Sequence, residues 1–220
     1  MTIEGVIWDF GGVFTTSPFE AFNRYEAQVG LPRDFIRTVN ATSPDSNAWA
    51  LFERGEIDSF TFNRKFLAES TALGHPLRGA EVLPLLYGEV RPRMVEALII
   101  CKRRFKVGCI TNNMVQGHGS GMAVSPEGAA RVGDIMRHFD AVIESSKAGV
   151  RKPDPRIYLM MCERLGVEAK GCIYLDDLGV NCKSAAQLGM AAIKVMSEAQ
   201  ALAELERATG LAFPKVIATA

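Results

Sequence analysis

The sequence predicts an α/β protein with a Rossmann-like, doubly wound parallel sheet in three α/β/α layers and an inserted helical cap domain. From residue 91 onward, apolar runs of strand length alternate with helical patterns, which is typical of parallel strands joined by right-handed helical crossovers. An apolar run at residues 6–8 leads directly into Asp9. Residues 17–88 carry helical patterns and no convincing strand. The helical block therefore interrupts an α/β core.

The composition is that of an ordinary globular protein. The 220 residues are 48% apolar, with 25 Lys and Arg against 25 Asp and Glu, so a core with a small insert is expected. The balanced charge gives no basic excess for nucleic acid, and no apolar run approaches the length of a membrane span. The five cysteines form no Cys-x-x-Cys pair and the start has no signal-peptide pattern, so we expect reduced thiols and a cytoplasmic location. The oligomeric state is left open.

The first expected strand ends in a turn that carries candidate catalytic and anion-binding groups. Asp9 follows the apolar run, and Gly11 and Gly12 come almost at once. Ligands of open α/β sheets collect at the carboxyl ends of the strands, and glycines allow a sharp turn and close approach of backbone N–H groups to an anion. Asp9 could instead only cap the turn.

Four helices are expected in the block that follows. Their apolar residues recur at helical spacing around residues 22–29, 35–39, 49–52 and 62–67, and Ser59 is a candidate N-cap for the last of them. We interpret residues 17–88 as a cap domain, with 1–16 and 89–220 forming the core. The alternative is that these helices simply cover the sheet, but the block is longer than one crossover needs.

The rest of the chain supplies the remaining strands and helices. Strands are expected at residues 105–110, 141–143, 172–175 and 191–195, and helices from Pro92, around 157–165, at 180–188 and at 198–208. Gly189 is the expected C-terminal cap of the third of these helices. Residues 114–133 are rich in glycine and are expected to be irregular, with a short helix near Ala129.

Polar side chains follow several of the expected strands. These are Asp9, then Thr111 and Asn112, then Lys152 in a loop, then Asp176 and Asp177. Parallel strands share one edge at their carboxyl ends, so we expect these groups to converge. Three close carboxylates would not all stay ionised without a cation, and carboxylate oxygens together with substrate phosphate suit Mg²⁺. A hydroxyl, backbone N–H groups and a lysine can neutralise a phosphoryl group. The pattern predicts Mg²⁺-assisted phosphoryl transfer with Asp9 as covalent nucleophile.

The order of these motifs resembles the haloacid dehalogenase superfamily, whose C1-type cap is similar to the helical insert. Within it the chain looks most like the phosphatase domain at the N-terminus of soluble epoxide hydrolases, and like a related domain of some acyl-CoA dehydrogenase fusions. The resemblance covers most of the core. It runs through Asp9, Thr111-Asn112, His138-Phe139-Asp140, Ile143-Glu144-Ser145, Lys152-Pro153, Tyr158 and Leu175–Asn181.

The resemblance implies a role for each motif residue. Asp9, Thr111 and Lys152 would be catalytic. Gly11, Gly12, Thr111, Asn112 and Lys152 would bind the phosphate of a small phosphorylated metabolite. Mg²⁺ would be held by Asp9, the carbonyl of Gly11, Asp177 and Asp176, the last directly or through water, and Asn181 would orient the lysine or the metal waters. The alternatives are that Thr111 and Asn112 only form a turn, that Lys152 is a solvated loop charge and that Asn181 caps a helix.

One position departs from the family pattern. Most related phosphatases carry an Asp two residues after the nucleophile as general acid and base, and this chain has Gly11 there. Three explanations remain open: a substrate with a good leaving group, an acid borrowed from elsewhere such as His118, or a different role. The last includes a metal- and phosphate-binding module with weak turnover and, less favoured, a C–halogen hydrolase, for which the Asp176-Asp177 pair would be a liability.

Overall fold

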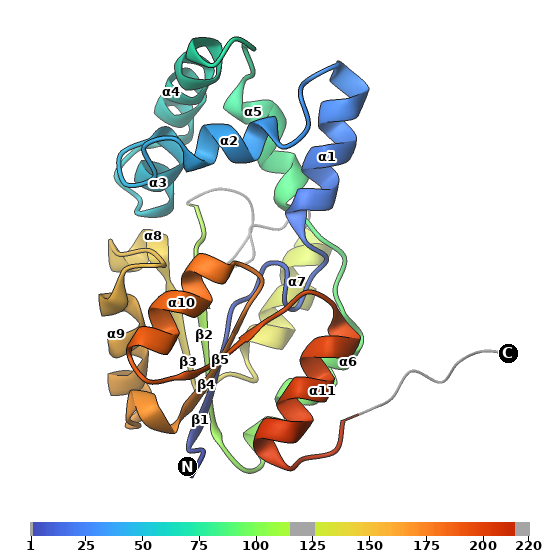
Figure 1. The fold of residues 1–220 in the computed structure, drawn as a ribbon, viewed down its shortest axis with the longest axis vertical. Coiled ribbons are helices and arrows are strands. Elements are labelled where there is room, and N and C mark those ends of the chain that lie inside the picture. The colour runs from blue at the N-terminus through green and yellow to red at the C-terminus, as the bar shows by residue number, and fades with distance from the viewer. Residues whose placement is uncertain (1, 115–125, 214–220) are drawn as a thin grey trace, which may run out of the picture.

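The structure is a computed structural model that describes residues 2–114 and 126–213. Its centre is a five-stranded parallel sheet with the order β3-β2-β1-β4-β5 (Figure 1). The strands are β1 (Gly5–Trp8), β2 (Lys106–Thr111), β3 (Ala141–Glu144), β4 (Cys172–Asp176) and β5 (Ala191–Lys194). The chain builds outward from β1 to β3, returns to the other side of β1 for β4, and ends at β5. The predicted α/β class is therefore confirmed.

Helices cover both faces of this sheet, and a helical region precedes them in the chain. That region holds α1 (Pro18–Val29), α2 (Phe35–Ala41), α3 (Ala48–Glu53), α4 (Ser59–Ala72), α5 (Gly79–Val82) and the 3-10 helix η1 (Leu83–Leu86). The core helices are α6 (Pro92–Lys102), α7 (Pro126–Met136), α8 (Ser145–Ala148), α9 (Pro155–Leu165), the 3-10 helix η2 (Ala169–Gly171), α10 (Gly179–Gln187) and α11 (Glu198–Thr209).

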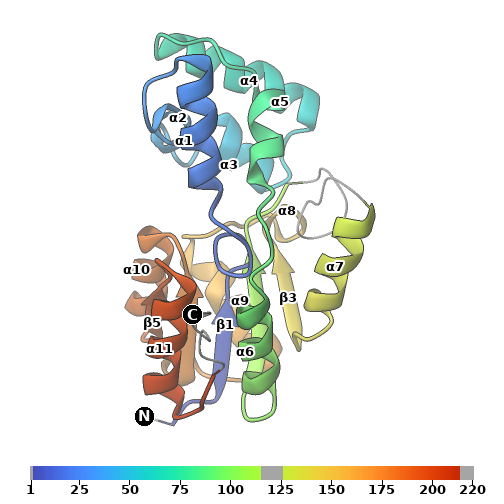
Figure 2. The ribbon, with the colours of Figure 1, turned by 90° about the vertical axis from the view of Figure 1, so that its right-hand side faces the viewer.

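The alternation of side chains along β1 divides the core into two apolar layers. Val6 and Trp8 face a cluster formed with α6, α7 and α11, while Ile7 faces a second cluster formed with α9 and α10. All three side chains are fully buried. Figure 1 shows the sheet from its edge, with α9 on its left and α6, α7 and α11 on its right, and Figure 2 looks onto the second of these layers. This arrangement explains why β1 is apolar throughout, and the first polar side chain after the strand is that of Asp9.

The helical insert sits over the carboxyl end of the sheet (Figures 1 and 2). It has an apolar core of its own, which includes Phe22, Phe52 and Phe62. The chain enters and leaves it through two segments that pair at an antiparallel bridge between Thr15 and Val90. This pairing lies beside the expected limits at 16/17 and 88/89. We propose that residues 17–88 form a cap domain and that 1–16 and 89–220 form the core.

Four local expectations differ from the structure. The helix near Ala129 is the full helix α7, and α8 lies where only a loop was expected. Asp58, not Ser59, caps α4, because its carboxylate accepts the N–H of Thr61. The C-terminal cap of α10 is Leu188, and Gly189 follows it in the left-handed region at φ 91°. The two caps differ from the expected residues by one position. The two helices depend on tertiary contacts.

Membrane crossing can be examined for the described part of the chain. Among the helices of residues 2–114 and 126–213, none combines the length and the apolar character that a bilayer span requires.

Candidate active site

The strand ends bring three acidic residues together. Asp9 follows β1, and its N–H donates to the carbonyl of Leu175 at 2.8 Å, which ties it to the end of β4. Asp176 is the last residue of β4 and Asp177 follows it. One carboxylate oxygen from each of the three residues lies within 4.8 Å of the others. The central position of β1, flanked by β2 and β4, is what makes this convergence possible.

Lys152 joins two of these carboxylates. Its Nζ lies 2.6 Å from Asp9 Oδ1 and 2.9 Å from Asp176 Oδ2, and its side chain is 1% exposed. The two carboxylates raise the pKa of the Lys152 ammonium, against the opposing effect of burial. Lys152 is therefore held as a cation inside the protein.

Asp176 is the most heavily bonded of the three acids. Besides Lys152, its Oδ2 accepts the hydroxyl of Tyr174 at 2.5 Å, and its Oδ1 accepts the N–H of Leu178 at 2.8 Å. The side-chain amide of Asn181 lies 3.1 and 3.0 Å from the two oxygens. Both oxygens of Asp176 are thus engaged, and the residue acts in this structure as an anchor for Lys152 and Asn181.

Burial and charge repulsion act on the other two acids. Burial raises the pKa of Asp9 well above its ordinary value, and the charges of Asp176 and Asp177 add to this while Lys152 opposes it. Burial, and then the charge of Asp176, raise the pKa of Asp177 to about 6. Both shifts have the same physical meaning: when these carboxylates are ionised, neither water nor nearby positive charge fully compensates them.

A divalent cation fits this imbalance. Three carboxylates and one ammonium leave a net charge of −2 when all are ionised. Among the described residues, hydrogen bonds to Asp9 reach only Oδ1, so Oδ2 remains free for a ligand. Asp177 accepts the Ser17 hydroxyl at 3.2 Å. The acidic cluster can therefore hold a metal ion, and an all-oxygen donor set suits Mg²⁺.

The two glycines after Asp9 differ from each other. A Cβ at Gly12 would overlap the carboxylate of Asp177, and Gly12 has φ of +74°, so only glycine fits there. Its N–H donates to Thr15 Oγ1 at 3.3 Å, and its carbonyl accepts Arg91 Nη1 at 2.7 Å. A Cβ at Gly11 would meet no atom within 4 Å among the described residues. The space beside Gly11 is therefore open.

A cavity of about 1020 Å³ lies between the core and the insert, and it contains most of the predicted site. Asp9, Gly11, Thr111, Asn112, Lys152, Asp177 and Asn181 all line it. Asp176 and Gly12 lie outside this lining, and Gly12 instead lines a neighbouring cavity of about 290 Å³ together with Asp177. His118 lies outside the described residues. The insert contributes aromatic walls, among them Phe19, Phe22 and Trp49.

Several residues of the site carry little or no signal in the sequence pattern. Tyr174 is a strand residue whose hydroxyl reaches Asp176, and Ser17 reaches Asp177 from the start of the insert. Glu53 and Arg151 form an ion pair at 2.6 Å across the boundary between insert and core. Only Arg151 has a weak signal, because it directly precedes Lys152.

Fold and site together define a class of hydrolases: an α/β core with a carboxylate at the end of its central strand, an acidic cluster that can hold a metal, and a helical insert over the site. The chain belongs to the haloacid dehalogenase-like hydrolase family, which it matches over residues 3–189. The predicted superfamily is thus confirmed.

Two curated proteins illustrate this relationship. Rat bifunctional epoxide hydrolase 2 is 34% identical over 230 residues, which are 98% of this chain and 40% of that protein. A Mycobacterium tuberculosis phosphatase is 29% identical over 207 residues, which are 89% of this chain and 88% of that protein. The chain thus spans less than half of the epoxide hydrolase it matches, in agreement with the predicted resemblance to that protein's phosphatase domain.

A solved structure shows the same fold. It is a haloacid dehalogenase family enzyme of Bacteroides thetaiotaomicron in complex with magnesium and inorganic phosphate. The TM-score is 0.57 at 18% identity, and the match covers 87% of this chain and 93% of that one.

Proposed function

We propose that this chain is a Mg²⁺-dependent phosphatase that hydrolyses small phosphate esters through an aspartyl-phosphate on Asp9. The observation that carries the proposal is the cluster of three carboxylates, two buried and one partly exposed, around one buried lysine, which is short of two positive charges. The family membership supports hydrolysis, and the phosphatase among the relatives supports a phosphate ester as substrate.

The chemistry divides into two displacements at phosphorus. In the first, a carboxylate oxygen of Asp9 bonds to phosphorus while the bond to the ester oxygen breaks, and the departing oxygen takes up a proton. In the second, water bonds to phosphorus, its proton leaves, and the bond to Asp9 breaks, so that inorganic phosphate is released. Each step needs charge neutralisation more than any other help.

Several residues have proposed roles in these steps. Lys152 neutralises Asp9 and the phosphoryl oxygens, while Thr111 and the backbone of Asn112 hold phosphate oxygens. The backbone turn at Gly11 and Gly12 approaches the phosphate. Asp9, the Gly11 carbonyl and Asp177 would hold Mg²⁺, with Asp176 contributing directly or through water. The metal would supply charge neutralisation at the phosphoryl group.

Gly11 limits the substrates that this site can use. A positioned acid and base contributes about 10²–10⁴-fold in rate, and position 11 has open space but no side chain. We therefore expect substrates with good leaving groups, such as aryl phosphate esters or acyl phosphates, which are mixed anhydrides. Gly11→Asp places a carboxyl in the open space and should raise the hydrolysis of simple alkyl phosphates more than that of p-nitrophenyl phosphate.

The test is turnover of p-nitrophenyl phosphate and acetyl phosphate with Mg²⁺ and with EDTA, for the parent chain and for Asp9→Asn. We expect turnover only in the parent chain with Mg²⁺. Turnover that persists in Asp9→Asn would remove the nucleophile assignment. If neither compound is turned over while Mg²⁺ and phosphate still bind, the chain is a binding module, the alternative that the missing acid at Gly11 favours.

A further inference from the structure

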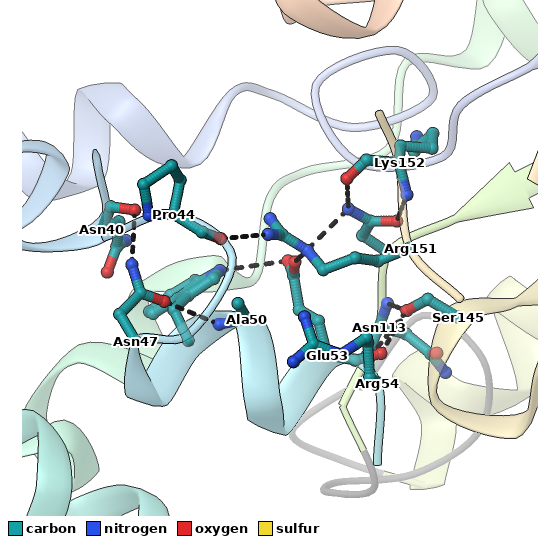
Figure 3. A network of polar contacts seen from close by, with 12 residues as sticks. Asn40, Pro44, Asn47, Ala50, Glu53, Arg54, Asn113, Ser145, Arg151 and Lys152 are labelled. Carbon is teal, nitrogen blue, oxygen red and sulfur yellow. Dashed lines mark hydrogen bonds and ion pairs between the residues drawn. The ribbon is translucent and has the colours of Figure 1, made fainter. Parts of the chain in front are cut away.

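Glu53 is a buried carboxylate of the insert that reaches into the core. It lies in α3, and its side chain is 10% exposed. Its Oε2 accepts Arg151 Nε at 2.6 Å and Asn112 Nδ2 at 3.3 Å, and its Oε1 accepts the indole N–H of Trp49 at 3.0 Å. Figure 3 shows Glu53 of the insert facing Arg151 of the core. We call this set of contacts the Glu53 bridge.

Asn112 carries the Glu53 bridge on to Lys152. Its Oδ1 accepts the backbone N–H of Lys152 at 2.9 Å, and its Nδ2 donates to the backbone carbonyl of Lys152 at 3.1 Å. The amide of Asn112 therefore holds both polar atoms of the Lys152 main chain. Because Nδ2 also donates to Glu53, one carboxylate of the insert contacts the group that clamps the lysine and the arginine that precedes it.

Further contacts tie the same part of the insert to the core. Arg151 Nη1 donates to the carbonyl of Pro44, and the hydroxyl of Ser145 donates to the carbonyl of Glu53 at 2.6 Å. A Cβ at Gly55 would lie 2.5 Å from the carbonyl of Ser146. The end of α3 is thus packed directly on α8, and the Glu53 bridge forms only when the insert occupies this position.

Loss of Glu53 would remove the acceptor of the Trp49 indole within the insert and would change two groups of the core. Arg151 would keep a partly buried positive charge without its carboxylate, and Asn112 would lose one acceptor for its amide. A buried charge or donor without a partner is costly, so both groups would shift toward water or toward new partners. Both are covalently next to the phosphate-binding residues Thr111 and Lys152, so the shift would move these as well.

We propose that Glu53 is a positioning residue that couples the seating of the insert to the placement of Lys152. The phosphate-binding side of the site is fully formed only when the insert rests on the core through the Glu53 bridge. This inference rests on the proposed function for its effect on catalysis, but not for its structural content.

The kinetic test compares Glu53→Gln with Glu56→Gln. Glu56 is a matched control, because it pairs with Arg54 at 2.5 Å within the same part of the insert and its side chain is 49% exposed. We expect Glu53→Gln to lower kcat for p-nitrophenyl phosphate by roughly ten- to a hundredfold, as displaced supporting groups do, with KM changed less. Glu56→Gln should match the parent chain. An unchanged kcat in Glu53→Gln would overturn the proposal.

A second readout does not depend on turnover. Hydrogen exchange should speed up in Glu53→Gln at two separate places, residues 44–54 of the insert and residues 151–154 of the core, and not in Glu56→Gln. Faster exchange in the insert alone would show that Glu53 stabilises only its own domain, and would overturn the coupling. If the parent chain turns over no phosphate ester, the proposed function fails. The exchange measurement still shows whether Glu53 couples the insert to the core.

A milder variant covers the case in which Glu53→Gln does not fold. Arg151→Lys keeps a positive charge beside Glu53 but loses the contact with Pro44. It should give the same pattern of exchange with a smaller fall in kcat. A folded Arg151→Lys chain with parent-like kcat and exchange would count against the bridge.

Discussion

The Lys152 ammonium is fully buried between the carboxylates of Asp9 and Asp176. Removing one partner of a buried ionic group leaves the rest without compensation, which costs far more than the net contribution of the intact group. The charges of this site therefore affect the free energy of unfolding of the protein as well as the proposed reaction. Tyr174 and Asn181 strengthen the arrangement by donating to the same carboxylate of Asp176.

Lys152→Met should lower the free energy of unfolding by about 3–5 kcal/mol, measured by urea denaturation at pH 7 in EDTA. The control is Lys147→Met, because Lys147 forms an ion pair of 2.7 Å with Glu144 but is 74% exposed. An exposed pair contributes about 0–1 kcal/mol. Equal losses in the two variants would contradict the assigned role of the buried lysine.

The adjacent glycines provide a second comparison at this scale. Gly12→Ala must hold a positive φ and overlap Asp177, so it should cost at least about 1–2 kcal/mol and weaken Mg²⁺ binding. Gly11→Ala meets open space and should change stability by less than about 1 kcal/mol. Urea unfolding and Mg²⁺ titration of both variants check this. A tolerated Gly12→Ala would mean that the turn sits differently against Asp177.

Some residues of the site could be predicted from the sequence next to them, and others could not. Asp9, Thr111, Asp176 and Asp177 could be predicted because each lies at a strand end, and strand ends share one edge of a parallel sheet. The structure brings them together, although their individual roles remain proposals. Glu53 could not be predicted, because its partners are distant in sequence and only the docked insert brings them within reach.

At the scale of elements, Asn47 determines how α3 begins. Its side-chain oxygen accepts the N–H of Ala50 at 2.8 Å, and its amide donates to the carbonyls of Asn40 and Thr42 at 2.8 Å each. One buried side chain therefore caps α3 and holds the end of α2 against it. Since Glu53 is the last residue of α3, the cap at Asn47 helps to hold the helix that carries the Glu53 bridge.

Asn47→Ala should lower the free energy of unfolding by about 1–3 kcal/mol, because it removes an N-cap and takes the Asn47 amide away from two partly buried carbonyls. Asn47→Asp keeps the cap acceptor and loses only the donors, so it should lie between Asn47→Ala and the parent chain. Thermal unfolding of the three chains checks this order. If Asn47→Asp is as unstable as Asn47→Ala, the loss of stability comes from the two hydrogen bonds that the Asn47 amide donates, and the N-cap contributes nothing.

Elements with strong periodicity could be predicted, and short ones could not. The strand at Cys172–Asp176 and the helix at Glu198–Thr209 stand close to their expected limits, because apolar runs and capping residues mark them. The helix Ser145–Ala148 has no apolar face to signal it, and it depends on Ser145, which bonds to both Asn113 and the insert. Such an element follows from tertiary contacts.

At the scale of the whole molecule, the strand order places β1 between β2 and β4. The parallel sheet could be predicted from the alternation of strands and helices, but periodicity alone does not give the order of strands. That order is what brings Asp9 beside both Thr111 and the Asp176-Asp177 pair. The insert then closes the cavity from above with aromatic residues such as Phe19 and Trp49.

The most direct measurement of the central claim is to trap the covalent intermediate. The chain is quenched with acid during turnover of p-nitrophenyl phosphate with Mg²⁺, reduced with borohydride and analysed by peptide mass spectrometry. We expect residue 9 to be converted to homoserine, because reduction acts on an acyl phosphate and not on a free carboxylate, and we expect no such product in Asp9→Asn. Sustained turnover without modification at residue 9, or with the phosphoryl group on another residue, would contradict it.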